Sequence, residues 1–194
     1  MVAMPKKLNV TFGPISLSNI EQVRFICLKS KLYFALLYYL TVAKRIQLRR
    51  INTVAFPIQY NEGFYQDVLQ RNNAELNKFA YSNEFVIGAV CARVEDMDKS
   101  GRKRLYIMTL AVLAAYRGRG IGSDLLRSLL IYCEKNEPRI SEIALHVHVS
   151  NDDAIRFYTE KFGFTKGPIV ENYYRRIDPP HCYLLYKKLD EETS

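Results

Sequence analysis

Three glycines lie within five residues in the segment YRGRGIGSDLL, 116–126. A nearly continuous apolar run precedes this segment and a helical pattern follows it, so the glycines fall between a predicted strand and the N-terminus of a predicted helix. Glycine lets the backbone approach a ligand closely, and the first N–H groups of a helix have no partner within the helix. The loop could therefore bind a pyrophosphate, although such a glycine cluster can also be a simple turn. It is not a Walker loop, because no Gly-Lys-Ser/Thr follows. It is also a poor dinucleotide-binding fingerprint, because no acidic residue that could bind a ribose lies at the end of the next strand.

Tyr106, His146 and His148 are the candidates for proton transfer. Tyr106 lies in the apolar run RLYIMTLAVL, 104–113, before the glycine loop, and the two histidines lie in EIALHVHV, 142–149, after the helix. If these strands are neighbours, their side chains can face one cleft. Both histidines remain candidates, because residues i and i+2 of a strand share a face. An imidazole with an unperturbed pKa of about 6.5 suits a general base, whereas a tyrosine with a pKa near 10 would better orient a water.

The order of predicted elements indicates an α/β fold. Strands are predicted at 7–15, 77–83, 84–96, 104–113, 142–149, 171–177 and 182–189. A first helix is predicted from an N-cap at Ser18 or Asn19 to a point before Pro57, and further helices at 61–69, 120–137 and 151–162. A tight turn at Ser82 and Asn83 would make the second and third strands a hairpin. This order implies a single domain, 1–194, with a mixed sheet, helices on both faces and a flexible tail at 190–194.

Composition argues against several classes of protein. The net charge of +8 comes from basic residues that are mostly scattered, so we expect no direct nucleic-acid binding. The four cysteines show no Cys-x-x-Cys pair and no metal-ligand spacing with the histidines, and no secretory signal precedes them. We therefore expect reduced thiols, no metal and a cytoplasmic protein. The uncharged run LYFALLYYLTV, 32–42, is shorter than the roughly 20 apolar residues of a membrane span, which leaves a buried or interfacial helix.

Two linked motifs resemble those of the GCN5-related N-acetyltransferase (GNAT) superfamily. Arg117, Gly120 and Gly122 fit its Arg/Gln-x-x-Gly-x-Gly/Ala signature, and NDDAIRFYTEKFGF, 151–164, resembles its ending with Asn, Tyr and Gly-Phe. The resemblance implies a GNAT fold with a mixed central sheet of about six to seven strands, and acetyl-CoA as cosubstrate. The residues that it implies for acetyl-CoA binding are Leu110, Val112, Arg117, Gly118, Arg119, Gly120, Ile121, Gly122, Ser123, Asn151 and Tyr158.

Further segments narrow the resemblance to the San-type N-alpha-acetyltransferases, the catalytic subunits of NatE. These segments are FPIQYNEGFYQDVL, NKFAYSNEFVIGAVCARVE, KRLYIMTL, LHV and ENYYRRIDP, and the similarity covers most of 5–190. It implies acetyl transfer to the alpha-amine of nascent or free protein N-termini that retain Met before varied, often hydrophobic residues, with lysine side chains as further acceptors. It also implies NatA subunits at the ribosome as partners and the nucleus as a second compartment.

The resemblance assigns proton transfer to Tyr106 and His146, because its LHV pattern selects His146 over His148. A base is needed because a peptide alpha-amine, with a pKa of about 7.7 to 8.0, is mostly protonated at neutral pH and then cannot attack a thioester. Tyr158 is implied to lie near the sulfur, where it would stabilise or protonate the leaving thiolate. Asn151 is also well placed to cap its helix, which is the structural alternative to a cofactor contact.

The same resemblance implies an apolar, aromatic pocket that selects an N-terminal methionine by burial. Each of these side chains could equally belong to the core. The residues implied are Phe56, Pro57, Ile58, Tyr60, Met108, Tyr173, Tyr174 and Ile177.

Two features depart from the family pattern. Ala111 and Ala115 replace a glycine and a proline beside the glycine loop, and the 25 residues 23–47 are extra. The extra segment has no acidic residue, glycine or proline and five basic residues. Its first two codons, Val-Arg, can read GTAAGA or GTGAGA, which is an intron donor sequence, and its last codon can read CAG, which is an acceptor sequence. Leu40-Thr41 permits CTAAC, a branch site. We interpret the segment as a retained intron, read in frame, that lengthens the first helix or bulges from it.

Three other functions compete with this interpretation. The chain could acetylate another amine, such as a polyamine or free lysine, or it could be a catalytically weakened subunit that only docks on a ribosome-associated complex. A membrane-bound variant that uses 32–42 is the third.

Overall fold

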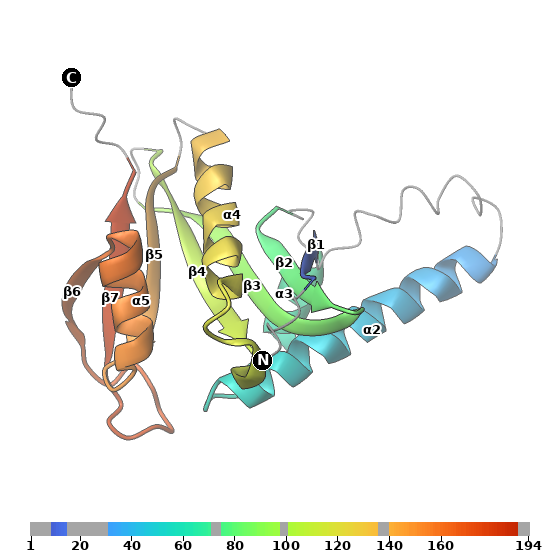
Figure 1. Cartoon of the computed structure of the whole chain (residues 1–194), viewed down its shortest axis with the longest axis horizontal. Coiled ribbons are helices and arrows are strands. Elements are labelled where there is room, and N and C mark those ends of the chain that lie inside the picture. Colours follow the sequence, from blue (N-terminus) through green and yellow to red (C-terminus); the bar gives the residue numbers. More distant parts are fainter. Residues whose placement is uncertain (1–8, 15–30, 71–74, 98–100, 136–139, 190–194) are drawn as a thin grey trace, which may run out of the picture. The chain divides into compact units, whose positions relative to one another are not determined.

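The computed structural model describes residues 9–14, 31–70, 75–97, 101–135 and 140–189, with the backbone alone described at 31–38 and Gln70 (Figure 1). The elements in chain order are β1 (Thr11–Pro14), α2 (Lys31–Ala55), α3 (Glu62–Gln70), β2 (Asn77–Ser82), β3 (Phe85–Asp96), β4 (Lys103–Val112), the 3-10 turn η2 (Ala114–Tyr116), α4 (Ile121–Lys135), β5 (Ile140–His148), α5 (Asp152–Phe162), β6 (Thr165–Val170) and β7 (Cys182–Lys188). The predicted N-cap at Ser18 or Asn19 and the predicted tail at 190–194 lie outside the described residues.

The strands form a mixed, seven-stranded sheet in the order β1-β2-β3-β4-β5-β7-β6. β1, β2 and β3 pair antiparallel, β4 and β5 pair parallel, and β7 pairs antiparallel with both β5 and β6. The predicted α/β fold with a mixed sheet of six to seven strands is confirmed. The described residues group into two compact units, here called unit 1 (within Met1–Cys91 and Thr109–Leu129) and unit 2 (within Ala92–Met108 and Leu130–Ser194).

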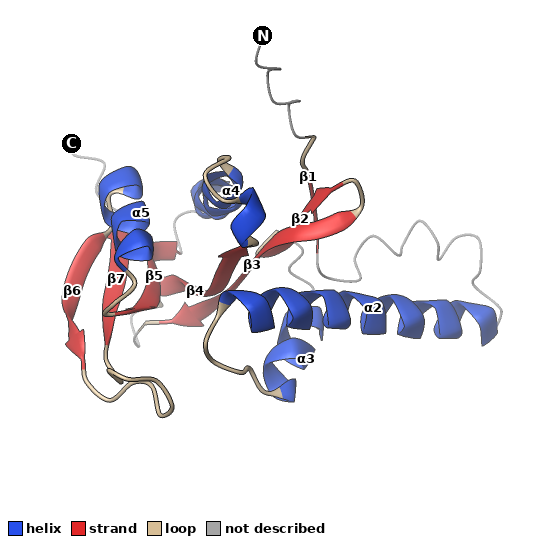
Figure 2. Cartoon of the chain, turned by 60° about the horizontal axis from the view of Figure 1, so that its bottom comes forward, coloured by secondary structure: helices blue, strands red, loops and turns tan. Residues whose placement is uncertain are grey.

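Unit 1 has a core of large apolar side chains from α2, β2 and α4. Figure 2 shows α2 and α3 on one face of β2 and β3, with α4 on the other, so helices cover both faces in this unit. Gly88 on β3 lets α4 pack closely, because an added Cβ would meet the Ala111 carbonyl oxygen at 3.1 Å and the Leu125 Cδ1 at 3.4 Å. The fully buried side chains of this core include Leu48, Leu76, Phe79, Leu125, Leu126 and Leu129.

Replacing Gly88 by Val should lower the free energy of unfolding by about 1–3 kcal/mol, because the new methyl groups overpack a site with no free space. Chemical denaturation of the purified protein measures this change. Gly63→Ala is the matched control: Gly63 is exposed, lies in the first turn of α3, and an added Cβ meets only the Asn61 Oδ1, at 3.4 Å. An unchanged stability in Gly88→Val would contradict the close packing described here.

Unit 2 combines β5, β6 and β7 with α5 and the first part of β4. Tyr158 of α5 is buried and packs its ring against Phe164, at 5.3 Å between ring centroids. The helix begins after Asn151, whose side chain accepts a hydrogen bond from the Ala154 N–H, and it ends at Gly163 in the left-handed conformation with φ +67°. The predicted cap and helix bounds are therefore confirmed at this element.

The described part of the extra segment, 31–47, is helical and continuous with the rest of α2. Over these residues the segment lengthens the first helix, as one of the two alternatives predicted, and the helix ends before Pro57. Leu48, Ile51 and Asn52 are buried, whereas Tyr39 and Ile46 are exposed. The Lys44 Nζ donates a hydrogen bond to the Pro14 carbonyl at 3.3 Å. None of the helices in the described ranges has both the length and the apolar character that a membrane crossing requires.

Two predictions of local structure are wrong. The hairpin turn lies at Asn83 and Glu84, one residue later than predicted, because Ser82 pairs with Phe85. Both turn residues have positive φ, 46° and 68°, as a two-residue hairpin turn of type I′ requires. Asparagine is enriched at positive φ, whereas glutamate is not, so the pattern did not locate the turn.

The segment 171–177 is a loop, although a strand was predicted there. It turns at Asn172, which has φ +55°, and the Tyr174 N–H donates to the Pro180 carbonyl at 2.9 Å. The strand lies just before it, as β6, TKGPIV. Gly167 and Pro168 are unusual in strands, so the sequence pattern did not indicate one here. Proline is tolerated because β6 is an edge strand and its pairing is irregular between Lys166 and Ile169.

Candidate active site

One face of β4 carries four of the predicted site residues. Leu105, Ile107, Thr109 and Ala111 are buried, and the alternate residues are half-buried. Because side chains alternate along a strand, these half-buried residues share the other face. They include Tyr106, Met108, Leu110 and Val112.

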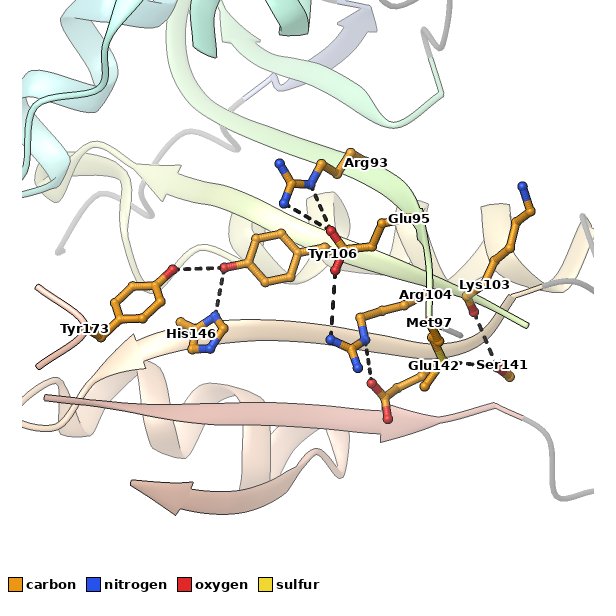
Figure 3. A network of polar contacts seen from close by, with 10 residues as sticks. All are labelled: Arg93, Glu95, Met97, Lys103, Arg104, Tyr106, Ser141, Glu142, His146 and Tyr173. Atoms are coloured by element: carbon orange, nitrogen blue, oxygen red, sulfur yellow. Dashed lines mark hydrogen bonds and ion pairs between the residues drawn. The ribbon is translucent and has the colours of Figure 1, made fainter. Parts of the chain in front are cut away.

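Tyr106 and His146 meet in unit 2, as the sequence predicts (Figure 3). The Tyr106 Oη lies 2.9 Å from the His146 Nδ1, and β4 pairs with β5 so that Tyr106 is opposite Ala144. Tyr173, from the loop between β6 and β7, completes the cluster. Its ring stacks on the His146 imidazole at 4.4 Å and 18°, and its hydroxyl lies 3.4 Å from the Tyr106 Oη. The imidazole is therefore oriented by a hydrogen bond and by a stacked ring.

The surroundings of His146 and Tyr106 favour the neutral form of each side chain. Burial, followed by the nearby charge of Arg104, lowers the pKa of His146 below its usual 6.5, so the imidazole is neutral and able to accept a proton at pH 7. Burial and the Tyr173 hydroxyl raise the pKa of Tyr106 far above 10, so this hydroxyl keeps its proton. Because the two pKa values move apart, His146 is able to accept a proton and Tyr106 is able to donate a hydrogen bond at neutral pH.

Four charged side chains continue from this cluster along β3, β4 and β5. Arg93 bonds Glu95 at 3.0 Å, and its guanidinium carbon lies 5.2 Å from the centre of the Tyr106 ring. Arg104 lies 3.8 Å from Glu95 and 2.8 Å from Glu142. We name Arg93, Glu95, Arg104 and Glu142 the charge ladder.

Both ring nitrogens of His148, the rival candidate base, form hydrogen bonds with backbone groups. Its Nε2 lies 2.7 Å from the Pro179 carbonyl oxygen and must donate to it. Its Nδ1 accepts a hydrogen bond from the Ser150 N–H at 3.3 Å. With one ring nitrogen donating and the other accepting, the neutral imidazole has no lone pair left for a substrate proton. The arrangement favours His146 as the base.

The glycine loop leads from η2 into α4 in unit 1. Gly118 and Gly120 have φ of +73° and +85°, and nothing lies within 4 Å of a Cβ built at either one. Ile121 begins a helix of 15 residues, so the first N–H groups of this helix have no partner within it and lie at the positive end of its dipole. Arg117 is fixed by a hydrogen bond from its Nε to the Val112 carbonyl at 3.1 Å. This donor set fits a pyrophosphate. The remaining predicted cofactor residues of the loop are Arg119, Gly122 and Ser123, of which Ser123 is buried.

Ala111 and Ala115, the departures from the family pattern, lie on the segment that leads to the glycine loop. Ala111 is buried on β4, Ala115 lies in η2, and the Leu113 N–H between them donates to the Ile87 carbonyl at 2.9 Å.

Asn151 and Tyr158 have structural roles in unit 2 besides their predicted cofactor contacts. Asn151 caps α5, whose first turn carries Asp152 and Asp153, so this helix start suits an anion less well than that of α4. Tyr158 is buried, and burial raises its pKa well above 10, so its hydroxyl stays protonated. A protonated phenol can donate to a thiolate.

The predicted substrate residues fall into two groups, one in each unit. In unit 1, Phe56 and Tyr60 form an aromatic row with Phe64, with centroids 5.9 and 4.5 Å apart. Pro57 beside them is exposed and Ile58 is half-buried. In unit 2 the group comprises Met108, Tyr173, Tyr174 and Ile177. Burial raises the pKa of Tyr174 to about 12, so it too is an uncharged surface for an apolar side chain.

The charge ladder and the contacts of His148 were missed from the sequence. A signal for the ladder was present in the spacing of polar residues. Arg93 and Glu95 are two residues apart on β3 and so share one face, and Arg104 and Tyr106 do the same on β4. Three neighbouring strands with polar residues at period two indicate a polar sheet face. No group of acidic, histidine or cysteine side chains suited to a metal occurs among the described residues.

Comparison with known proteins identifies the family. The sequence model of the acetyltransferase (GNAT) family matches residues 45–164. The chain belongs to the GNAT family. The match begins near the end of the extra segment, so 23–44 lie outside it.

The relatives within this family include an N-alpha-acetyltransferase of a fish and a probable N-acetyltransferase of an insect. N-alpha-acetyltransferase 50 of Danio rerio is 48% identical over 143 residues, 74% of this chain and 82% of the relative. The probable N-acetyltransferase san of Drosophila melanogaster is 44% identical, over 74% of each chain. The structure of Arabidopsis thaliana Naa50 with the bisubstrate analogue CoA-Ac-MVNAL is 46% identical, with a TM-score of 0.66 over 73% of this chain and 90% of that one. The predicted resemblance to the NatE catalytic subunit, the N-terminal acetyltransferase class and acetyl-CoA as cosubstrate are confirmed.

Proposed function

We propose that this GNAT enzyme acetylates the alpha-amine of protein N-termini that retain methionine. The observation that carries the proposal is the Tyr106–His146–Tyr173 cluster, in which a neutral imidazole is oriented at 2.9 Å from a protonated phenol. The peptide part of the analogue bound to Arabidopsis Naa50, MVNAL, begins with methionine. Apolar and aromatic side chains at the predicted substrate positions suit burial of a methionine side chain.

In the proposed mechanism, His146 removes the proton that keeps the amine from reacting. Acetyl-CoA supplies an acetyl thioester as the electrophile. If the His146 Nδ1–H donates to the Tyr106 Oη, the Nε2 lone pair is free to accept the amine proton, directly or through a water. The Tyr106 hydroxyl then donates to Tyr173 or to that water. The amine nitrogen bonds to the acetyl carbon as the carbon–sulfur bond breaks, and the protonated Tyr158 hydroxyl is the proposed hydrogen-bond donor that stabilises the leaving thiolate.

Turnover of acetyl-CoA on three peptides tests the substrate class. We expect kcat/KM to be highest for a peptide that begins Met-Leu, and at least about tenfold lower when Ala or Ser replaces Met, because burial of a methionine side chain contributes roughly 1.5–3 kcal/mol. Equal rates on the Ala and Met peptides, or a preference for spermidine or free lysine, would contradict this proposal. A lysine within an N-terminally blocked peptide tests the side-chain activity separately.

The same assay on a chain lacking 23–47 tests the extra segment. Activity of the shortened chain alone would mark the segment as inhibitory and support the retained-intron interpretation. Activity of both chains would make it a tolerated extension of α2. Activity of neither, with acetyl-CoA binding intact, would favour a docking subunit. Partnership with NatA subunits at the ribosome, and location in the cytoplasm and nucleus, belong to the same proposal, and co-purification with and without 23–47 tests them.

A further inference from the structure

We propose that His148 is a positioning residue that holds the loop 171–181 so that Tyr173 stays on His146. We call residues 171–181 the acceptor loop. The inference rests on the proposed function, because it assigns the acceptor loop to binding of the peptide rather than of acetyl-CoA.

His148 joins β5 to the far end of the acceptor loop. Its Nε2–H donates to the Pro179 carbonyl at 2.7 Å, while the Ser150 N–H donates to its Nδ1 at 3.3 Å and fixes the ring. Its ring also lies beside Tyr174, with 5.6 Å between centroids. The half-buried imidazole is thus held at three points, and two of them belong to the acceptor loop.

Contacts within the loop carry this restraint to Tyr173. The Tyr174 N–H donates to the Pro180 carbonyl at 2.9 Å, and the Asn172 N–H donates to the His181 Nδ1 at 3.2 Å. These two bonds tie the beginning of the loop to its end. Tyr173 lies between the two donors, so its position depends on where Pro179 to His181 are held.

Tyr173 in turn contacts the groups that transfer the proton. Its ring stacks on His146 and its hydroxyl lies 3.4 Å from the Tyr106 hydroxyl, while the residue remains 43% exposed. An exposed aromatic ring beside the base is available to an incoming peptide. Loss of the His148 bond should therefore loosen the acceptor side of the site and leave the Tyr106–His146 hydrogen bond intact.

The variants His148→Phe and His148→Gln separate this role from general stability. Phenylalanine keeps an aromatic ring beside Tyr174 but has no N–H, whereas glutamine supplies an amide donor of similar reach. We expect the KM for a Met-Leu peptide to rise roughly three- to tenfold in His148→Phe, as expected for the loss of one hydrogen bond, with the KM for acetyl-CoA within twofold of wild type. His148→Gln should restore the KM to within about threefold.

Hydrogen exchange of the Asn172 and Tyr174 amides gives a readout that does not depend on turnover. Exchange at both should be faster in His148→Phe than in wild type and His148→Gln. An unchanged KM and exchange rate in His148→Phe, or equal impairment of the two variants, would overturn the inference. A wild-type chain that exchanges as expected but does not acetylate Met peptides would instead overturn the proposed function, and the exchange data would still support the loop restraint.

Discussion

Replacing His146 by Asn should lower kcat on a Met-Leu peptide by about 10²- to 10⁴-fold, the usual contribution of a positioned general base. Asparagine can still donate an N–H toward Tyr106, but it has no basic lone pair. The dissociation constant of acetyl-CoA should stay within twofold, because His146 lies in a cluster with Tyr106 and Tyr173 and not in the glycine loop. Stopped assays of CoA release measure kcat, and calorimetry measures the affinity.

The pH dependence provides a second test of the same variant. In wild type, log kcat/KM should rise with a slope of one between about pH 6.5 and 7.7, as the peptide amine loses its proton. Below the lowered pKa of His146 the slope should steepen to two, because the imidazole also becomes protonated and can no longer act as a base. His146→Asn should keep a slope of one throughout. A second break that persists in the variant would assign the base to another group.

Tyr106→Phe is the matched comparison for this result. Phenylalanine preserves the ring under Arg93 but removes the oxygen that contacts His146, so we expect a smaller loss, about tenfold in kcat. The raised pKa of Tyr106 also predicts no alkaline loss of wild-type activity below about pH 10 from this group. A loss as large as that of His146→Asn would make the phenol an obligatory participant in proton transfer.

Replacing Gly120 by Val should raise the KM for acetyl-CoA at least tenfold. A β-branched residue is strongly disfavoured at φ +85°, and its side chain would cover the backbone that a pyrophosphate must approach. The change should appear in the dissociation constant of CoA itself, measured by calorimetry on the folded variant.

Gly101→Val is the control for strain alone. Gly101 has nearly the same φ, +83°, with nothing within 4 Å of an added Cβ, but it lies before β4 in unit 2. Both variants should lose similar stability, and only Gly120→Val should lose affinity for CoA. Equal losses of affinity would attribute the effect to stability and would remove the glycine loop from the binding site.

The elements that sequence alone predicts well are those with strong periodicity or caps. β4 and α5 belong to this class, because β4 is a long apolar run and Asn151 marks the start of α5. Tyr106 and His146 could be placed together because they lie on strands that a helix connects. The position of Tyr173 could not, since a loop that is closed by Asn172 and His181 leaves no period in the sequence.

The failures have specific physical causes. β6 was missed because its glycine and proline are tolerated at a sheet edge, where the strand has a neighbour on one side only. The role of His148 could not be predicted, because the sequence shows only that the residue is a histidine. It does not show whether the side chain donates to a carbonyl or takes a proton from a substrate. Only the positions of Pro179 and Ser150 distinguish them.

The charge ladder has a consequence for the response of the enzyme to ionic strength. Its two arginines and two glutamates alternate in sign at separations of 2.8 to 3.8 Å. Mobile ions screen electrostatic interactions over about 8 Å at physiological salt, so they weaken the attraction between such close partners only slightly. At longer range the two positive and two negative charges cancel. The acid limb assigned to His146 should therefore keep its position between low and high salt.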